Sequence, residues 1–291
     1  MRIVHNNIAD SATIVTLVSG TRYSIAGGTI NGASTTANAN IAYLQNDYKS
    51  QAYRAASAST IQIILTWTTA QTVGCVALPC TNLSKNATVQ VLLYTDPATG
   101  SASLDSGSLS ACTDTPLANW TRTNVAPDAN SFSYGGVSKT AVWFPTQPNN
   151  IRRVQINITD TNNLANNIDI ARIVCGSYWQ SQFQVDRNGL TVSVQDTSSN
   201  TRTDAGELVS DQGYLHDQLS FSLGLIPETD RNKLVEIIRS VGTSRNIFVS
   251  VFQESNSLQE QQYSIYGKRD NSLIEYIIAG YYSHSLSVVG W

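Results

Sequence analysis

The sequence predicts a mainly β protein, in which a jelly-roll β-sandwich is followed by an α+β domain with one helix on a mostly antiparallel sheet. Short apolar or alternating runs, separated by Gly, Asn, Ser and Pro, fill residues 1–178 without an amphipathic helix, a pattern typical of all-β domains. One clear helix pattern follows at residues 227–242, between further strand-like runs. With 291 residues and 41% hydrophobic content, the chain is long enough for two ordinary domains with their own cores.

Three segments of the first part alternate apolar and polar residues, as strands with one buried face do. Their apolar positions are Ile61, Ile63, Leu65 and Trp67; Val89, Val91 and Leu93; and Val154, Ile156 and Ile158. Further strand-like runs are expected at residues 73–78, 141–144 and 168–176. Long connections of small residues, at 26–33 and 99–109, suit loops across the ends of a sandwich, so two packed sheets are the expected closure.

The second part begins near residue 180 and combines strands with the helix. Strands are expected at residues 190–194, 219–223, 246–252, 262–267, 273–278 and 286–289, with a polar turn region after the first. Apolar residues of the helix fall at i, i+3, i+4 and i+7, namely Leu234, Ile237, Ile238 and Val241. Their single stripe needs a sheet to cover it, and Gly242 ends the helix. We therefore expect two domains, residues 1–180 and 181–291.

Charge and hydropathy limit the classes of partner that are expected. Charged residues make up 13% of the chain, and its formal net charge is −3, whereas a typical domain has roughly 25% charged residues. Neutral polar surface is common where subunits pack together, because it costs less to desolvate than charge does. Lys and Arg form no basic stripe, so nucleic acid is not an expected partner. No apolar run reaches membrane-spanning length, and residues 1–7 lack the apolar core of a signal peptide, so we expect a soluble protein made in a cytoplasm, without membrane insertion.

Cysteine and histidine positions give no metal motif. Free, buried thiols are expected at Cys75, Cys80, Cys112 and Cys175, because no export signal accompanies them. The histidines, His5, His216 and His284, stand at no ligand spacing. Residues 160–163, Asp-Thr-Asn-Asn, resemble a fragment of a calcium loop without its central Gly and closing Glu, and a type I or Asx turn explains them as well. We predict no cofactor and no metal site, and structural calcium in the sandwich stays open.

Common catalytic motifs are missing from the sequence, which has no G-x-G-x-x-G, P-loop, H-E-x-x-H or G-x-S-x-G. Asp204, Glu207 and Asp211 form the best acidic cluster, and a glycosidase could use such carboxylates as acid and nucleophile. Their Gly- and Ser-rich surroundings favour a solvated turn between two strands. His216 with Asp211 or Asp217 could orient a base, but a surface histidine is the simpler interpretation. The sequence therefore predicts a protein that is not an enzyme.

Aromatic side chains beside neutral amides offer another kind of site, because exposed rings can stack on sugars. Trp120 and Tyr134, in the long loop between residues 112 and 139, are the candidates for carbohydrate contact, with Arg122 and Asn124 nearby. Ordinary packing or subunit contact is the favoured alternative for both rings. Three other tryptophans lie in apolar runs and are expected in the core: Trp67, Trp143 and Trp179.

Six segments between residues 35 and 180 carry a recognisable series of strands: 53–55, 61–67, 74–78, 82–84, 87–91 and 171–179. This series resembles the galactose-binding-like, discoidin-type jelly roll. The resemblance is a pattern of strands and includes no catalytic motif. It implies a fold that binds sugars in some relatives and only packs in others.

In the second part, a further resemblance rests on six segments, at residues 189–194, 219–223, 230–242, 247–252, 263–268 and 281–286. Their order is similar to the tail-tube fold and looks like baseplate and tail-tip proteins of long-tailed, non-contractile bacteriophages. The resemblance implies a structural virion protein near the distal tail or upper baseplate, which forms a ring and carries an outward-facing jelly roll. The implied partners are further copies in a trimer or hexamer ring, other tail and baseplate proteins, and a host-surface glycan.

The apolar C-terminal segment adds candidates for assembly contacts. Residues 285–291 end on Trp291, and such a ring packs into its own sheet or across an interface. Tyr281 and Tyr282 precede this segment. The leading hypothesis is therefore a structural protein of a phage tail tip. The alternative is a carbohydrate-binding receptor-recognition module, and a polysaccharide depolymerase that uses the acidic cluster is less favoured.

Overall fold

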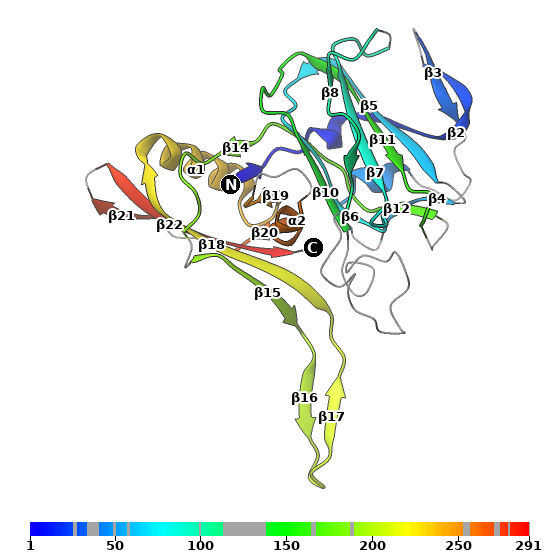
Figure 1. Cartoon of the computed structure of the whole chain (residues 1–291). Helices are drawn as coiled ribbons and strands as arrows, with labels where there is room; N and C mark the ends of the chain where they lie inside the picture. Colours follow the sequence, from blue (N-terminus) through cyan, green and yellow to red (C-terminus); the bar gives the residue numbers. More distant parts are fainter. Residues whose placement is uncertain are drawn as a thin grey trace. The chain divides into compact units, whose positions relative to one another are not determined.

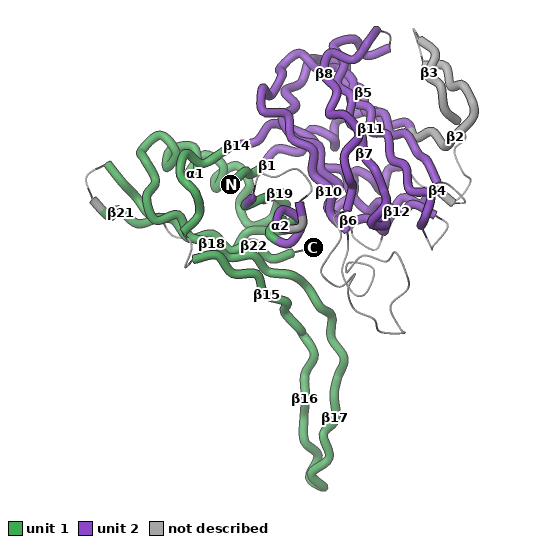
Figure 2. Tube along the Cα trace, in the orientation of Figure 1, with its two compact units in different colours: residues 1–3, 180–251, 263–291 green, residues 4–179, 252–262 purple. Residues whose placement is uncertain are grey.

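The structure of the chain, a computed structural model, describes residues 1–25, 28–33, 41–48, 51–56, 59–98, 100–112, 138–163, 167–186, 189–252, 257–270, 274–278 and 280–290. Strands dominate it (Figure 1), and the predicted mainly β class is confirmed. The chain forms two compact units, each made of more than one segment (Figure 2). Unit 1 contains Met1–Ile3, Gln180–Val251 and Tyr263–Trp291, and unit 2 contains Val4–Trp179 and Phe252–Gln262.

Unit 2 is a sandwich of two antiparallel sheets. One sheet has the order β3-β2-β5-β11-β7-β8, with β9 beside β7, and the other has the order β10-β6-β12-β4, with β13 beside β6. The strands of the first sheet are β2 (Thr13–Ile25), β3 (Gly28–Ala33), β5 (Thr60–Gln71), β7 (Thr88–Tyr94), β8 (Leu104–Asp105), β9 (Leu109–Ser110) and β11 (Ile151–Thr159). Those of the second are β4 (Tyr53–Ala56), β6 (Cys75–Thr81), β10 (Ser138–Trp143), β12 (Asn167–Ile170) and β13 (Val174–Gly176). Two short 3-10 helices, η1 (Ile8–Ser11) and η2 (Ile41–Gln45), complete the unit's first segment.

The core of unit 2 lies between these sheets. All ten apolar residues of the three predicted alternating runs are buried in one cluster, so that prediction is confirmed. The central strand β11 pairs with both β5 and β7, and its residue Ile156 stands opposite Ile63 on one side and Val91 on the other. Cross-strand alignment of this kind places the same face of all three strands against the opposite sheet.

Residues 252–262 complete unit 2 from a distant part of the sequence. They contain α2 (Leu258–Gln262), which contacts β10. The indole nitrogen of Trp143 donates a hydrogen bond to the carboxylate of Glu260, whose side chain is buried. Trp143 also packs edge to face against Tyr178, with ring centroids 5.2 Å apart. The three tryptophans expected in the core are buried: Trp67, Trp143 and Trp179.

Unit 1 is built on a sheet with the order β14-β1-β19-β20-β22-β18-β15, and β21 pairs with β22 beside this series. Its strands are β1 (Arg2–Val4), β14 (Trp179–Gln180), β15 (Thr191–Asp196), β18 (Leu215–Pro227), β19 (Asn246–Ser250), β20 (Ser264–Arg269), β21 (Ile274–Ile278) and β22 (Tyr281–Gly290). A separate two-stranded sheet consists of β16 (Ser199–Arg202) and β17 (Leu208–Asp211).

The helix α1 (Glu228–Val241) covers this sheet, as the sequence predicts. Its buried residues Leu234, Ile237 and Val241 form the expected stripe, and α1 contacts β18 and β22. Gly242 follows with a φ of 62°, a left-handed conformation in which glycine ends a helix at low cost. No described helix is long and apolar enough to cross a membrane.

Unit 1 differs from the sequence prediction at two places. The polar turn region expected after residue 194 is a paired ribbon that includes β16 and β17. The strand expected from residue 262 begins at Ser264, because α2 extends to Gln262. The single boundary expected near residue 180 stays a prediction about domains, and the compact units depart from it by placing Met1–Ile3 in unit 1 and Phe252–Gln262 in unit 2.

Candidate assembly interface

A long two-stranded ribbon projects from the sheet of unit 1 (Figure 1). We call residues 191–217 the arm; it consists of β15, β16, β17 and the first residues of β18. Every residue from 199 to 215 is exposed. From Asp196, the last residue of β15, to the turn at Gly206 the arm extends roughly 30 Å, at about 3.3 Å per residue.

Continuous pairing holds the arm together. Residues 191–196 pair with 215–220, and β16 pairs with β17 from Ser199 opposite Asp211 to Arg202 opposite Leu208. At the tip, the backbone N–H of Thr203 donates to the carbonyl of Glu207, and Gly206 has a φ of 84°. A glycine at this position suits the left-handed residue of a hairpin loop.

Close backbone approach explains a second glycine, between β17 and β18. The N–H of Gly213 donates to Ser198 Oγ at 2.9 Å. A β-carbon at Gly213 would lie 2.4 Å from the carbonyl carbon of Thr197, so a larger residue would push the two strands apart there. The two strands of the arm therefore have a defined backbone contact at this position and do not form an irregular loop.

Apolar side chains are spread along the arm without a core to cover them. Val192, Val194, Leu208, Val209, Tyr214 and Leu215 are 42 to 69% exposed. Val192 pairs with the buried Leu219, and Asp196 pairs with Leu215. Since residues two apart on a strand share a face, the face of β18 that carries Leu219 and Phe221 into the core continues outward to Leu215.

The apolar side chains of the β16–β17 ribbon are exposed, and its strands pair only with each other in the described part of the chain. The β16–β17 sheet has no third strand among the described residues. Two-stranded ribbons are marginally stable alone in water, and open edges are templates for pairing with another chain. The sequence signal for this surface is weak, because it consists of a few Val and Leu residues within a polar, Gly- and Ser-containing stretch.

The predicted acidic cluster lies on the arm. Asp204 and Glu207 are in the tip turn, and Asp211 stands opposite Ser199 on the ribbon. All three carboxylates are exposed. This placement gives the arm negative charge. It leaves the carboxylates in solvent and not in a pocket that would exclude water from a bound substrate.

The histidine considered as a base lies at the start of β18. His216 and Asp217 are successive strand residues, so their side chains point to opposite faces. The ring of His216 instead lies beside that of Tyr214, with centroids 5.7 Å apart and the ring planes tilted by 38°.

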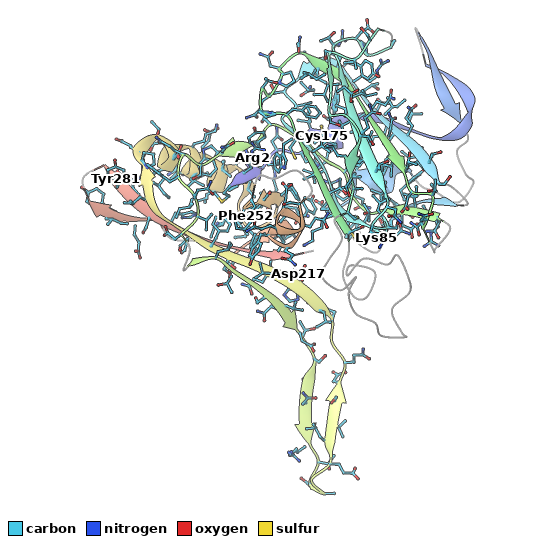
Figure 3. The ribbon with its side chains drawn as sticks, in the orientation of Figure 1. Arg2, Lys85, Cys175, Asp217, Phe252 and Tyr281 are labelled. Atoms are coloured by element: carbon cyan, nitrogen blue, oxygen red, sulfur yellow. The ribbon has the colours of Figure 1, made fainter. Side chains whose placement is uncertain are left out.

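A second exposed apolar patch lies at the opposite end of β18. The patch consists of Leu225, Tyr276, Ile277 and Tyr281, which are 41 to 65% exposed. Tyr281 pairs with Pro227 of β18 and with Ile278 of β21. Figure 3 shows Tyr281 beside β21 and Asp217 at the base of the arm. Of the two predicted assembly tyrosines, Tyr281 is thus an exposed surface residue.

The other predicted tyrosine, Tyr282, is partly covered by its own neighbours. Its ring lies edge to face against Tyr276, with centroids 5.5 Å apart. The guanidinium of Arg231 lies 5.2 Å from the centre of the same ring. Tyr282 therefore supports Tyr276 within the patch.

Several other predicted site residues lie outside the part of the chain that the structure describes. These are the carbohydrate-contact candidates Trp120, Arg122, Asn124 and Tyr134, and the assembly candidate Trp291. Their roles stay predictions.

Residues 160–163 of unit 2 form an anchored turn. The carboxylate of Asp160 accepts hydrogen bonds from the backbone N–H and the hydroxyl of Ser84, at 2.8 and 2.5 Å, and from the side-chain amide of Asn163 at 3.1 Å. Asp160 is 1% exposed. Charge-assisted bonds of this kind satisfy a buried carboxylate. Within the described ranges, no group of three or more His, Cys, Asp or Glu side chains could hold a metal ion.

The four cysteines, all within the described ranges, are thiols and form no disulfide there. Cys75, Cys112 and Cys175 are buried as expected, whereas Cys80 is half-buried. Burial raises the pKa of the Cys112 thiol to about 12, chiefly through desolvation of the thiolate. Burial likewise raises the pKa of Cys175.

Comparison with known proteins gives weak structural likenesses. No protein-family model matches the chain, and no curated protein matches it. Similar solved structures include two domains of carbohydrate-related proteins and a particle tail. The first is CBM32-1 from a family 31 glycoside hydrolase of Clostridium perfringens, with 12% identity, coverage of 56% of this chain and 94% of that one, and a TM-score of 0.32.

The second is a histidine mutant of the lectin binding domain of Lectinolysin complexed with Lewis b, with 11% identity, coverage of 59% and 96%, and a TM-score of 0.33. The third is the tail of an empty GTA particle with C6 symmetry, with 15% identity, coverage of 35% and 78%, and a TM-score of 0.24. At these TM-scores the likenesses carry no functional weight.

Proposed function

We propose that this chain is a structural protein that assembles with further copies of itself through the arm of unit 1. The observation that supports the proposal is the uninterrupted exposure of residues 199–215, a paired ribbon with Leu208, Val209 and Leu215 in water. An exposed apolar strand with open edges is an aggregation hazard in a free monomer. A defined partner surface removes that hazard.

The finer part of the proposal is a place in a phage particle. The order of strands and helix in residues 181–291 is similar to the tail-tube fold, so we assign the chain to a ring in the tail tip or baseplate, with unit 2 displayed and other tail proteins as neighbours. A trimer and a hexamer both remain open. The proposal gives the chain no catalytic activity.

The experiment is sizing of the full chain by multi-angle light scattering over a concentration series. We expect discrete oligomers in the wild type. A shortened variant, in which residues 198–213 are replaced by Asn-Gly between Thr197 and Tyr214, keeps the β15–β18 pairing and gives a two-residue hairpin turn. It should be a monomer with an unchanged circular dichroism spectrum in the near ultraviolet.

A wild type that stays monomeric at all concentrations and is missing from purified particles contradicts the proposal. The same holds if the shortened variant forms the wild-type oligomer, because the arm would then have no part in assembly.

Glycan recognition by unit 2 stays a separate prediction, carried by Trp120 and Tyr134. Calorimetric titration with host-surface glycans tests it. Binding that is unchanged when both rings are replaced by Ala would remove these residues from consideration.

A further inference from the structure

We propose that the acidic arm of one copy docks on a basic cluster of the next copy, formed by Arg239, Arg245 and Arg269. This inference rests on the proposed function, because it names the surface that receives the arm when the chain self-assembles. The occupant of the basic cluster is a second copy of this chain.

Unit 1 separates its charges between the arm and the remainder. Residues 191–217 contain five Asp and Glu and one Arg, a formal charge of −4 with His neutral. The rest of unit 1, over the segments that define it, contains eight Lys and Arg and six Asp and Glu, a formal charge of +2. Opposite potentials on two surfaces steer their encounter and fix their register.

The cations come together where α1 ends and β19 and β20 lie side by side. Asn246 pairs with Lys268, so Arg245, one residue earlier, lies next to Arg269 at the end of β20, whereas Lys268 faces the other side of the sheet. Nη2 of Arg269 donates to the carbonyl of Ile238 at 3.5 Å, and this contact ties β20 to the last turns of the helix. Arg239 belongs to the same turns.

Two members of the cluster are available to a partner. Arg239 and Arg245 are exposed. Neither forms an ion pair with another residue in the described part of the chain. Asp270 is the acidic residue next to Arg269 in sequence, so the cluster keeps an excess of positive charge.

The arm of the same chain is directed away from this cluster. Val289 of β22 pairs with both Lys268 and Gln218, so about 10 Å, or two strand spacings, separates β20 from the base of the arm. From Gln218 the arm runs outward, and Glu207 lies roughly 35 Å further along at about 3.3 Å per residue. Figure 1 shows β16 and β17 projecting from the rest of unit 1. The carboxylates at the tip therefore need a second chain to meet these cations.

The β21 patch is the other surface of unit 1 that an arm could use, and its charge is less favourable. It carries the exposed Glu275, and the guanidinium of Arg231 lies over the ring of Tyr282. An acidic arm gains more from the basic cluster than from this patch.

Because the arm and the basic cluster are different surfaces, the contact is head to tail. A heterologous contact closes into a ring when its rotation fits and otherwise continues as a filament. An arm-to-arm contact would instead be isologous and would end at a dimer. This distinction makes the inference testable by mixing two variants.

The arm variant is Glu207→Lys with Asp211→Lys, and the body variant is Arg239→Glu with Arg245→Glu. The arm variant brings the formal charge of the arm from −4 to 0, and the body variant leaves a cluster of −1 against an arm of −4, so we expect each dissociation constant to rise about tenfold or more. Mixed in equal amounts, the two should recover association, because the unchanged arm of the body variant meets the unchanged cluster of the arm variant. The four changes in one chain should recover part of it, because the introduced lysines then face the introduced glutamates.

Asp96→Lys with Asp105→Lys in unit 2 is the matched control, since both residues are exposed and the change in net charge equals that of the arm variant. It should assemble as the wild type does. Sedimentation velocity at low and high salt reads out all five proteins, and the difference between wild type and variants should shrink at high salt.

A body variant that assembles like the wild type, with an arm variant that pairs with wild type, identifies an arm-to-arm contact and overturns the inference while the proposed function stands. Arm and body variants that stay apart when mixed also overturn it. A wild type that does not associate contradicts the proposed function itself.

Discussion

Replacing the apolar side chains of the arm should weaken assembly about 100-fold without weakening the fold. The variant has four substitutions: Val194→Thr, Leu208→Thr, Val209→Thr and Leu215→Thr. Threonine keeps a high strand propensity, so the ribbon should persist while its apolar surface is lost.

The exposed fractions set the magnitude. The four side chains are 66, 59, 54 and 61% exposed, in the order just given. Complete burial of a Val or Leu side chain contributes about 1.5–3 kcal/mol, so the exposed part of each can still contribute about 1–2 kcal/mol on docking. If an interface covers half of that area, the four together contribute about 3 kcal/mol, and their loss weakens the dissociation constant about 100-fold.

The unfolding free energy should change little, because exposed substitutions away from special contacts usually stay within about 0.5 kcal/mol each. Sedimentation equilibrium measures association, and urea unfolding monitored by tryptophan fluorescence measures stability. Tyr48→Thr is the control, since Tyr48 is 64% exposed on unit 2. If the unfolding free energy of the fourfold variant falls by several kcal/mol, or if the variant assembles with wild-type affinity, the arm is not the interface that its exposure indicates.

Three further outcomes follow from unit 2. Asp160→Ala should lower the unfolding free energy by about 3 kcal/mol in urea titrations, because the buried N–H and hydroxyl of Ser84 lose their acceptor; an unchanged midpoint would show that the turn is dispensable. Arg172→Met should cost about 2–3 kcal/mol by the same assay. This is less than for a fully buried pair, because the two carboxylates that the buried guanidinium contacts are 48 and 49% exposed and can be rehydrated; a stabilised variant would contradict this. Cys80 should react first with a thiol reagent at pH 8, while Cys112, whose pKa is raised to about 12 by burial, reacts only on unfolding; simultaneous reaction of all four thiols in the native protein would refute the assigned burial.

Residues that face a core were predictable from sequence. Ile61, Ile63 and Leu65 alternate because one face of β5 is buried, and α1 shows its 3.6-residue period because one stripe packs on the sheet. In both elements the burial that stabilises the structure also leaves the periodic pattern.

The arm was not predictable in the same way. Its strands β16 and β17 bury nothing within the chain, so no alternation distinguishes them from a turn, and Gly206 and Gly213 strengthen that impression. The strand β1 is missed for another reason. Its three residues pair with strands far along the chain, and sequence periodicity carries no information on such distant pairing.

The interleaving of the two units limits how the protein can be divided. A cut at residue 180 removes β1 from the sheet of unit 1. The strand β19 then becomes an edge strand, because β1 is its neighbour on that side. The same cut removes Glu260, the acceptor of the Trp143 indole, from unit 2. Each fragment would therefore expose groups that are buried in the whole chain, and we expect separately expressed halves to aggregate. In the intact chain, the four crossings between units should couple their unfolding into one cooperative transition.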